Sequence, residues 1–110
     1  MIAETVKKLE DAIRRIDSME GGRKTELLAL LNSLKDEVQR LSETHEEQAH
    51  SIASLADMAT HEATRQEKSA ELLNHSLDGL SISGQGFKAT HPQLVKTIND
   101  ICTMLANIGI

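Results

Sequence analysis

Apolar residues recur at alternating gaps of four and three along most of this chain, and this spacing constrains the fold more than any other feature. It places apolar side chains on one side of an α-helix. Each such segment therefore needs a partner helix, from its own chain or from another. The stripe is found in four segments: Ile2, Val6, Leu9, Ile13 and Ile16; Leu27, Leu31, Leu34, Val38 and Leu41; Leu73, Leu77 and Leu80; and Leu94, Ile98, Ile101, Leu105 and Ile108.

The composition narrows the fold class further. A chain of 110 residues has room for one domain with a small core. Because the chain has no Trp or Tyr and a single Phe, that core must be aliphatic, which suits narrow helix seams. No run of β-branched residues alternates with polar ones. We expect an all-α protein made of helical hairpins with coiled-coil-like packing.

The first two thirds of the chain are expected to form a hairpin and a long central helix. A first helix is expected over about residues 2–18, because Gly21 and Gly22 follow it as a stop signal. The next helix begins near Arg23. Since no Gly or Pro interrupts residues 23–66, one continuous helix of about 65 Å is predicted there. A break is the alternative, because Thr44 and Glu47 have capping-box spacing. Ser69 offers another N-cap.

The last third is expected to form a second hairpin, in which Leu73 begins one stripe and Leu94 the other. Thr90-His91-Pro92-Gln93 provides an N-cap hydroxyl and a proline in the first turn, so a helix should start there. Gly84 and Gly86 predict local fraying before this turn. The chain is thereby divided into an N-terminal hairpin (1–44), a connecting helix (45–68) and a C-terminal hairpin (69–110), together one structural domain.

Helix length argues for self-association. A first helix of about 17 residues covers roughly 26 Å and cannot shield a much longer second helix. A second copy of the chain, arranged as a twofold dimer, is the most economical cover.

Charge and cysteine content exclude several functional classes. The net charge is −5 and charges of both signs are mixed along the chain, so nucleic-acid binding is not expected. No segment approaches the roughly 20 apolar residues that span a bilayer, and no signal peptide is recognised, so we expect a cytoplasmic protein without a membrane partner. Cys102, the only cysteine, cannot form an internal disulfide and is interpreted as a small core residue.

The search for catalytic and metal-binding patterns leaves one weak metal candidate. His45 and His50 are five residues apart, which is wrong for a shared zinc ion on a regular helix. Glu47 and His50 do have the Glu-x-x-His spacing of carboxylate-bridged metal sites, which would need further ligands from an oligomer. No nucleophile is paired with a base, so we expect neither an enzyme nor a cofactor.

The C-terminal half resembles a known family. The likeness is carried by His61-Glu-Ala-Thr-Arg65, by Phe87-Lys-Ala-Thr-His-Pro92 and by the Gly-Ile ending. These residues resemble an uncharacterised family of short bacterial helical proteins, classified as a domain of unknown function. The resemblance implies a helical fold and no activity. The chain departs from the family pattern at Lys88, where an acidic residue is frequent, and at Gly84 and Gly86, where better helix formers are frequent.

Two functional hypotheses remain. The leading one is a non-enzymatic, self-associating helical protein that acts as a protein–protein interaction, scaffolding or regulatory module with an unidentified partner. Its candidate partner contacts are His61, Arg65, Lys88 and His91. The alternative is a metal-binding or sensor protein with Glu47 and His50 in a site formed across an oligomer.

Overall fold

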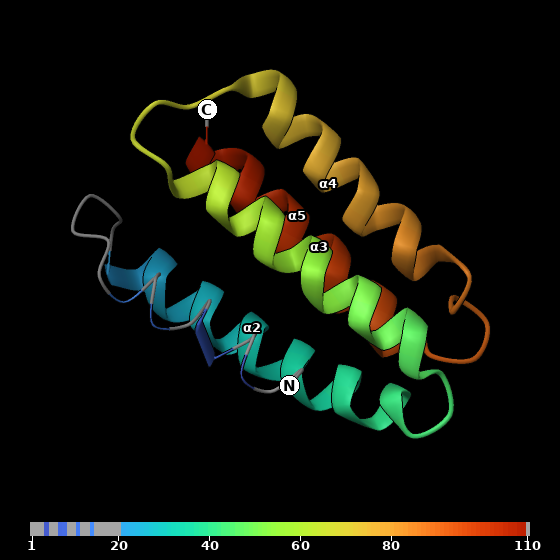
Figure 1. The fold of residues 1–110 in the computed structure, drawn as a ribbon. Coiled ribbons are helices and arrows are strands. Elements are labelled where there is room, and N and C mark those ends of the chain that lie inside the picture. The colour runs from blue at the N-terminus through green and yellow to red at the C-terminus, as the bar shows by residue number, and fades with distance from the viewer. Residues whose placement is uncertain (1–3, 5–6, 9–10, 12–13, 15–20, 110) are drawn as a thin grey trace.

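Four helices make up the continuous part of the chain that the structure describes. This computed structural model describes residues 21–109 and, before them, Glu4, Lys7, Lys8, Asp11 and Arg14. The helices are α2 (Gly21–Ser42), α3 (Glu46–Thr64), α4 (Ala70–Gln85) and α5 (Pro92–Gly109), and no strand occurs in the described part. Each helix runs antiparallel to the next (Figure 1). The predicted all-α fold is confirmed.

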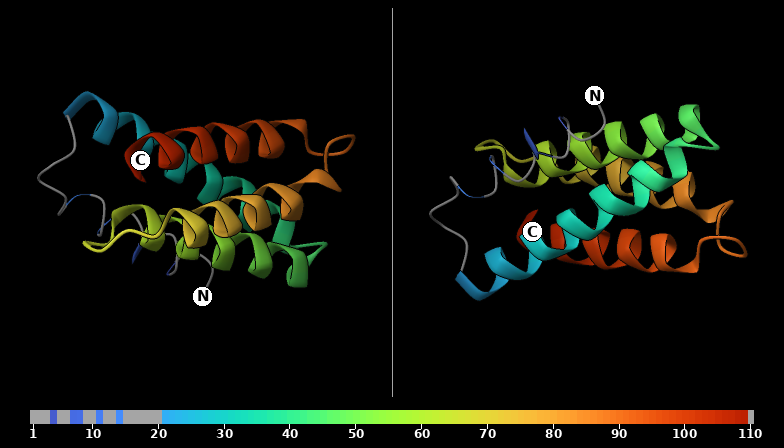
Figure 2. Two further views of the ribbon diagram at one scale, coloured as in Figure 1. Left: turned by 90° about the horizontal axis from the view of Figure 1, so that it is seen from above. Right: turned by 90° about the horizontal axis from the view of Figure 1, so that it is seen from below.

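The helices form a four-helix bundle with up-and-down topology. Helix α2 contacts α3 and α5, and α4 contacts the same two helices from the opposite side. Helices α3 and α5 also touch each other, whereas α2 and α4 do not. Figure 2 shows α2 crossing obliquely from the side of α5 to the side of α3. Segment 46–64, most of the predicted connecting helix, therefore lies against all three other helices.

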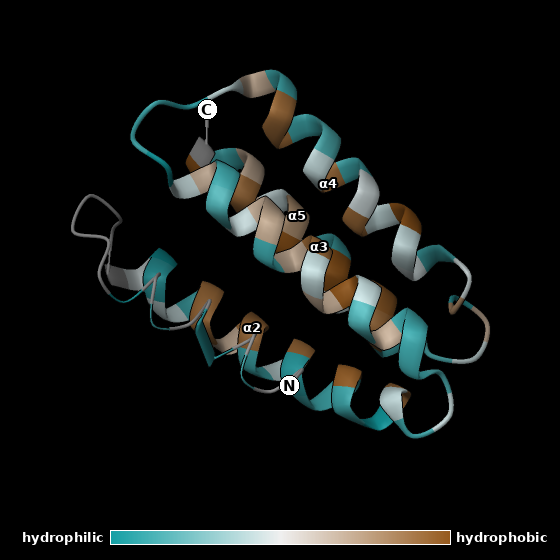
Figure 3. Ribbon diagram, viewed as in Figure 1, coloured by the Kyte–Doolittle hydropathy of each residue, from teal (hydrophilic) through white to brown (hydrophobic). Residues whose placement is uncertain are grey.

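The core is one apolar cluster to which all four helices contribute. In Figure 3 the hydrophobic residues of α2 lie along its edge toward α3. The predicted stripes of α2, α4 and α5 are buried in this cluster, with Ile108 only partly buried at its margin. The fully or nearly fully buried members are Leu27, Leu31, Leu34, Val38, Leu41, Ala49, Ile52, Ala53, Ala56, Ala59, Ala63, Leu73, Leu77, Leu80, Leu94, Ile98, Ile101 and Leu105.

The predicted long central helix is wrong. The helix ends at Ser42 and restarts at Glu46, so the chain turns back at residues 43–45. The folded chain is only 38 Å long in its largest dimension. A straight helix would leave the apolar side of α2 and the alanine-rich side of α3 exposed to water, whereas the turn buries both sides in the same core. The length argument for a dimer loses its premise, and the dimer itself stays a prediction.

The starts of α3, α4 and α5 agree with the sequence signals to within one residue. Ser69 is the N-cap of α4, and its Oγ accepts the N–H of Leu72 at 3.2 Å, as predicted. The break near Thr44 also occurs, but the N-cap of α3 is His45, without a side-chain capping bond, so the capping box with Glu47 does not form. Helix α5 begins with Pro92 in the first position, so Thr90 lies one residue too early to be its N-cap.

The second hairpin is confirmed, but its glycines do not fray the helix. Helix α4 continues to Gln85, and Gly84 is buried. A Cβ on Gly84 would lie 2.6 Å from Ile98 Cδ1, so the missing side chain lets α5 approach closely. A Cβ on Gly86 would meet nothing within 4 Å. The expectation of fraying was wrong because it weighed intrinsic propensity and not packing.

The predictions for the N-terminal hairpin fall mostly on residues outside the described part. Pairing of the stripe from Ile2 to Ile16 with α2 lies there. The start of the second helix is earlier than predicted, because α2 begins at Gly21 instead of Arg23. Lys24 Nζ donates to the carbonyl of Arg14 at 2.8 Å. No helix in the described part is long and apolar enough to cross a membrane.

Candidate functional site

The four predicted partner contacts lie at two ends of the bundle. Lys88 and His91 belong to the α4–α5 loop, whereas His61 and Arg65 lie at the C-terminal end of α3. In Figure 1 these regions are at opposite ends of the helices. The four side chains therefore do not form a single contact surface.

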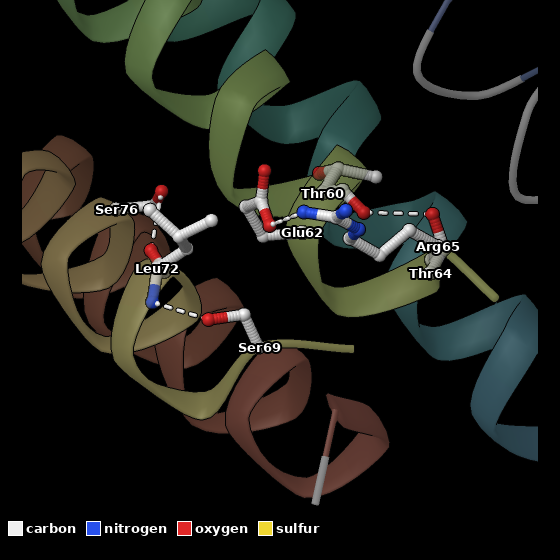
Figure 4. A network of polar contacts seen from close by, with 7 residues as sticks. All are labelled: Thr60, Glu62, Thr64, Arg65, Ser69, Leu72 and Ser76. Atoms are coloured by element: carbon white, nitrogen blue, oxygen red, sulfur yellow. Dashed lines mark hydrogen bonds and ion pairs between the residues drawn. The ribbon is translucent and has the colours of Figure 1, made fainter. Parts of the chain in front are cut away.

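The α3–α4 corner holds Arg65 in an ion pair. Arg65 Nη1 lies 2.9 Å from Glu62 Oε1, and the Glu62 side chain is only 12% exposed (Figure 4). Next to this pair, the Thr64 hydroxyl donates to the carbonyl of Thr60 at 2.8 Å. The hydroxyl oxygen of Thr60 is itself buried and has no hydrogen-bond partner in the described part of the chain. Arg65 thus forms a partly exposed ion pair at the end of α3.

The predicted metal ligands do not gather further ligands. Glu47 is exposed and His50 is half-buried on the first two turns of α3. Within the described residues no three His, Cys, Asp or Glu side chains are grouped so that they could hold a metal ion. The two residues are therefore surface positions of one helix in the single chain.

Three rings meet at the end of the bundle that carries the α2–α3 and α4–α5 loops. The ring centroid of Phe87 lies 5.3 Å from that of His45 and 5.6 Å from that of His91, and the two imidazoles are 6.5 Å apart. All three pairs are nearly perpendicular, which is a favourable geometry for aromatic rings. We call His45, Phe87 and His91 the ring cluster. It joins two loops that are distant in the sequence.

The two histidines of the ring cluster are held in the same way. Thr44 Oγ1 lies 2.8 Å from His45 Nδ1, and Thr90 Oγ1 lies 2.9 Å from His91 Nδ1. The backbone N–H of each histidine donates at 2.7 Å to a carbonyl four residues earlier, that of Leu41 or Phe87. Both turns therefore follow the pattern apolar-x-x-Thr-His. The repeat is visible in the sequence, but neither helix periodicity nor capping rules single it out.

The ring cluster makes packing contacts and hydrogen bonds. Each Nδ1 is occupied by a threonine hydroxyl, which leaves each Nε2 for a further contact. His45 is exposed, whereas Phe87 and His91 are half-buried. The cluster closes one end of the core and presents His91, one of the predicted partner contacts, at the surface.

A shallow cavity of about 280 Å³ lies between α2 and α5. Its lining combines carboxylates with apolar groups and comprises Glu26, Leu30, Asp100, Thr103 and Met104. Sequence reasoning missed this site because its residues come from two helices whose relative position no local pattern specifies.

Cys102 is a half-buried residue of the α4–α5 interface. Burial, and to a smaller extent the charge of Asp78, raises the pKa of its thiol from 9.0 to about 11. Its Sγ lies 3.8 Å from the carbonyl of Leu77. The thiol is therefore protonated at neutral pH, in agreement with its interpretation as a small core residue.

Three large apolar side chains remain exposed on α3 and α4. Met58 is 53%, Leu72 49% and Ile82 66% exposed. They border the seam where Gly79 meets Leu55, since a Cβ on Gly79 would lie 3.1 Å from Leu55 Cδ2. At about 100° per residue, Leu72 and Ile82 lie within about 60° of Gly79 around α4, and Met58 lies about 60° from Leu55 around α3. We call Met58, Leu72 and Ile82 the apolar strip.

Comparison with known proteins gives a family without an activity. Residues 27–110 match the family described as Domain of unknown function (DUF4404). The match covers the four-helix bundle except for the first six residues of α2. No curated protein and no solved structure matches the chain.

Proposed function

The chain belongs to the DUF4404 family, a domain of unknown function, and on that premise we propose that it is a non-enzymatic helical protein that self-associates and acts as a protein–protein interaction module. The apolar strip carries this proposal. Single exposed apolar residues are common on protein surfaces and need no explanation. Here three large ones border the same helix seam, and each is about half exposed or more.

A second copy of the chain is the proposed occupant of the strip. In a twofold dimer both subunits use the same surface, so the apolar strip of one subunit is covered by the apolar strip of the other. Burial of apolar surface supplies the driving force at roughly 25 cal/mol per Å². A scaffolding or regulatory role follows if a further protein binds the dimer, and the exposed Lys88 and the half-buried His91 at the bundle end are proposed contacts for it.

Sedimentation velocity over a range of protein concentrations tests this proposal. We expect the wild-type chain to dimerise at micromolar concentration and Ile82→Lys to weaken the dimer by about tenfold or more, because it places an ammonium group in an apolar contact. Asn74→Lys is the matched control. Asn74 is exposed on the same helix, about 160° around it from Leu72.

Two results would contradict the proposal. A wild-type chain that stays monomeric at all concentrations would exclude self-association. A dimer that Ile82→Lys and Asn74→Lys weaken equally would exclude the apolar strip as its interface. Circular dichroism spectra of both variants show whether the helices are retained, so that unfolding is not mistaken for dissociation.

A further inference from the structure

The α2–α5 cavity is smaller than most small-molecule sites. Its volume of about 280 Å³ is just below the roughly 300–1,000 Å³ of sites that enclose a complete small-molecule ligand. It lies between α2 and α5, whereas the apolar strip borders the seam between α3 and α4. The two surfaces can therefore be tested separately.

The lining of the cavity suits a cation on an aliphatic chain. Glu26 on α2 and Asp100 on α5 bring carboxylates from two helices, and Leu30 and Met104 add apolar surface. The Thr103 hydroxyl donates to the carbonyl of Asn99 at 3.0 Å, which leaves its oxygen free to accept another hydrogen bond. A lysine side chain has the matching parts, an apolar four-carbon stem and an ammonium group with three donors.

One of the two carboxylates already has a partner. Lys96 Nζ lies 2.9 Å from Asp100 Oδ2, but these side chains are 68% and 45% exposed. An exposed pair of this kind contributes little to stability. An incoming ammonium group that also reaches Glu26 can therefore displace Lys96 at small cost.

We propose that the α2–α5 cavity receives a lysine side chain of a partner protein. The stem packs on Leu30 and Met104, and the ammonium group lies between the carboxylates of Glu26 and Asp100. A compact ammonium group needs no planar alignment with either carboxylate, unlike a guanidinium group. This inference rests on the proposed interaction function and adds the chemistry of the partner to it.

An NMR titration of the full chain with Nα-acetyl-lysine N-methylamide tests the site. We expect saturable shifts of the Met104 and Thr103 methyl signals. The affinity calculated from these shifts should fall as salt is added. The double variant Glu26→Gln/Asp100→Asn should bind about fivefold less tightly or worse. Asp57→Asn, an exposed acid on α3 outside the cavity, is the matched control and should bind like the wild type.

Neutral and free-amine probes complete the test. The norleucine analogue of the probe keeps the aliphatic stem and lacks the ammonium group, and we expect its affinity to be at least about fivefold lower. Equal binding of the two analogues, or no saturable shift with the lysine probe, would overturn the proposal. Tighter binding of 1,5-diaminopentane than of the lysine probe would also overturn it, since the cavity would then be a site for free diamines.

Failure here is distinguishable from failure of the proposed function. We expect Glu26→Gln/Asp100→Asn to dimerise like the wild type in sedimentation velocity, because the cavity is not part of the apolar strip. A chain that dimerises through the strip but does not bind the lysine probe would refute only the cavity assignment.

Discussion

In the α2–α3 hairpin a leucine stripe packs on a helix whose buried positions are mostly alanine, whereas in the α4–α5 hairpin both helices contribute large aliphatic side chains. The turns of the two hairpins are alike, because Thr44-His45 and Thr90-His91 make the same hydrogen bonds. The interfaces are not. In the first, five alanines along α3 allow close approach, and in the second Gly84 makes room for Ile98.

This difference shows that one turn chemistry serves two kinds of interface. The alanines let the neighbouring helices approach closely along the whole of α3. A single glycine allows such close approach at one point only, and there the interface is most sensitive to added volume. The two hairpins should therefore respond differently to removed and to added atoms.

Removal of a buried leucine should have the largest effect and should cost more in the first hairpin. Leu31→Ala and Leu80→Ala, both fully buried, are each expected to lower the free energy of unfolding by about 2–5 kcal/mol. We expect Leu31→Ala near the upper limit, because alanine neighbours have no side-chain rotamers with which to fill the cavity. Urea denaturation measures both values. A larger loss for Leu80→Ala would remove the proposed distinction.

Thiol reactivity should differ between the hairpins by about two orders of magnitude. With its pKa raised from 9.0 to about 11, Cys102 has about a hundredfold less thiolate at pH 8 than it has in the unfolded chain. Alkylation by iodoacetamide should be correspondingly slower. The control is Ser54→Cys in a Cys102→Ser background, which places a thiol on the exposed surface of α3. Similar alkylation rates for the two thiols would contradict the buried setting of Cys102.

The same thiol predicts how stability depends on pH. The folded chain holds the Cys102 proton more tightly than the unfolded chain, because the pKa is higher in the folded state. The contribution of the protonated thiol to the free energy of unfolding is fully present below about pH 9 and is lost as the pH rises toward 11. The variant Cys102→Ser should lack this part of the loss, as measured by denaturation at a series of pH values.

Addition of one methyl group should have opposite effects at Gly84 and Gly86, the glycines at the end of α4. Gly84→Ala forces the buried Ile98 side chain to move, at a cost of about 1–3 kcal/mol that exceeds the gain of about 1 kcal/mol in helix propensity. Gly86→Ala adds its methyl group in open space and keeps a helical backbone (φ −62°, ψ −14°), so it should stabilise by about 0.5 kcal/mol. Thermal unfolding of both variants measures the difference. Equal shifts would show that Ile98 relaxes freely.

A small effect of opposite sign is expected for two threonines of α3. The buried Thr60 hydroxyl lacks a partner in the described part of the chain, so Thr60→Val should raise the free energy of unfolding by about 1 kcal/mol. The matched control is Thr64→Val, which removes a hydroxyl that donates to the carbonyl of Thr60 and should lower stability by up to about 1 kcal/mol. Destabilisation by Thr60→Val would indicate that its hydroxyl is satisfied.

The apolar spacing was sufficient to predict the helical fold class and the buried sides of α2, α4 and α5, but not the break between α2 and α3. Leu27, Leu31 and Leu34 are buried in α2 as the 3.6-residue period requires, and Ser69 and Pro92 mark helix starts for reasons confined to a few neighbouring residues. These features are local, so the order of residues along the chain specifies them.

The tertiary structure decided where the chain turns and which surfaces meet. Residues 43–45 favour neither a helix nor a turn strongly. They form a turn because the reversal of the chain buries the apolar sides of α2 and α3 in one core. Gly84 reads as a weak helix residue until Ile98 is placed beside it. The ring cluster and the α2–α5 cavity likewise combine residues from distant segments, and only packing sets the distances between them.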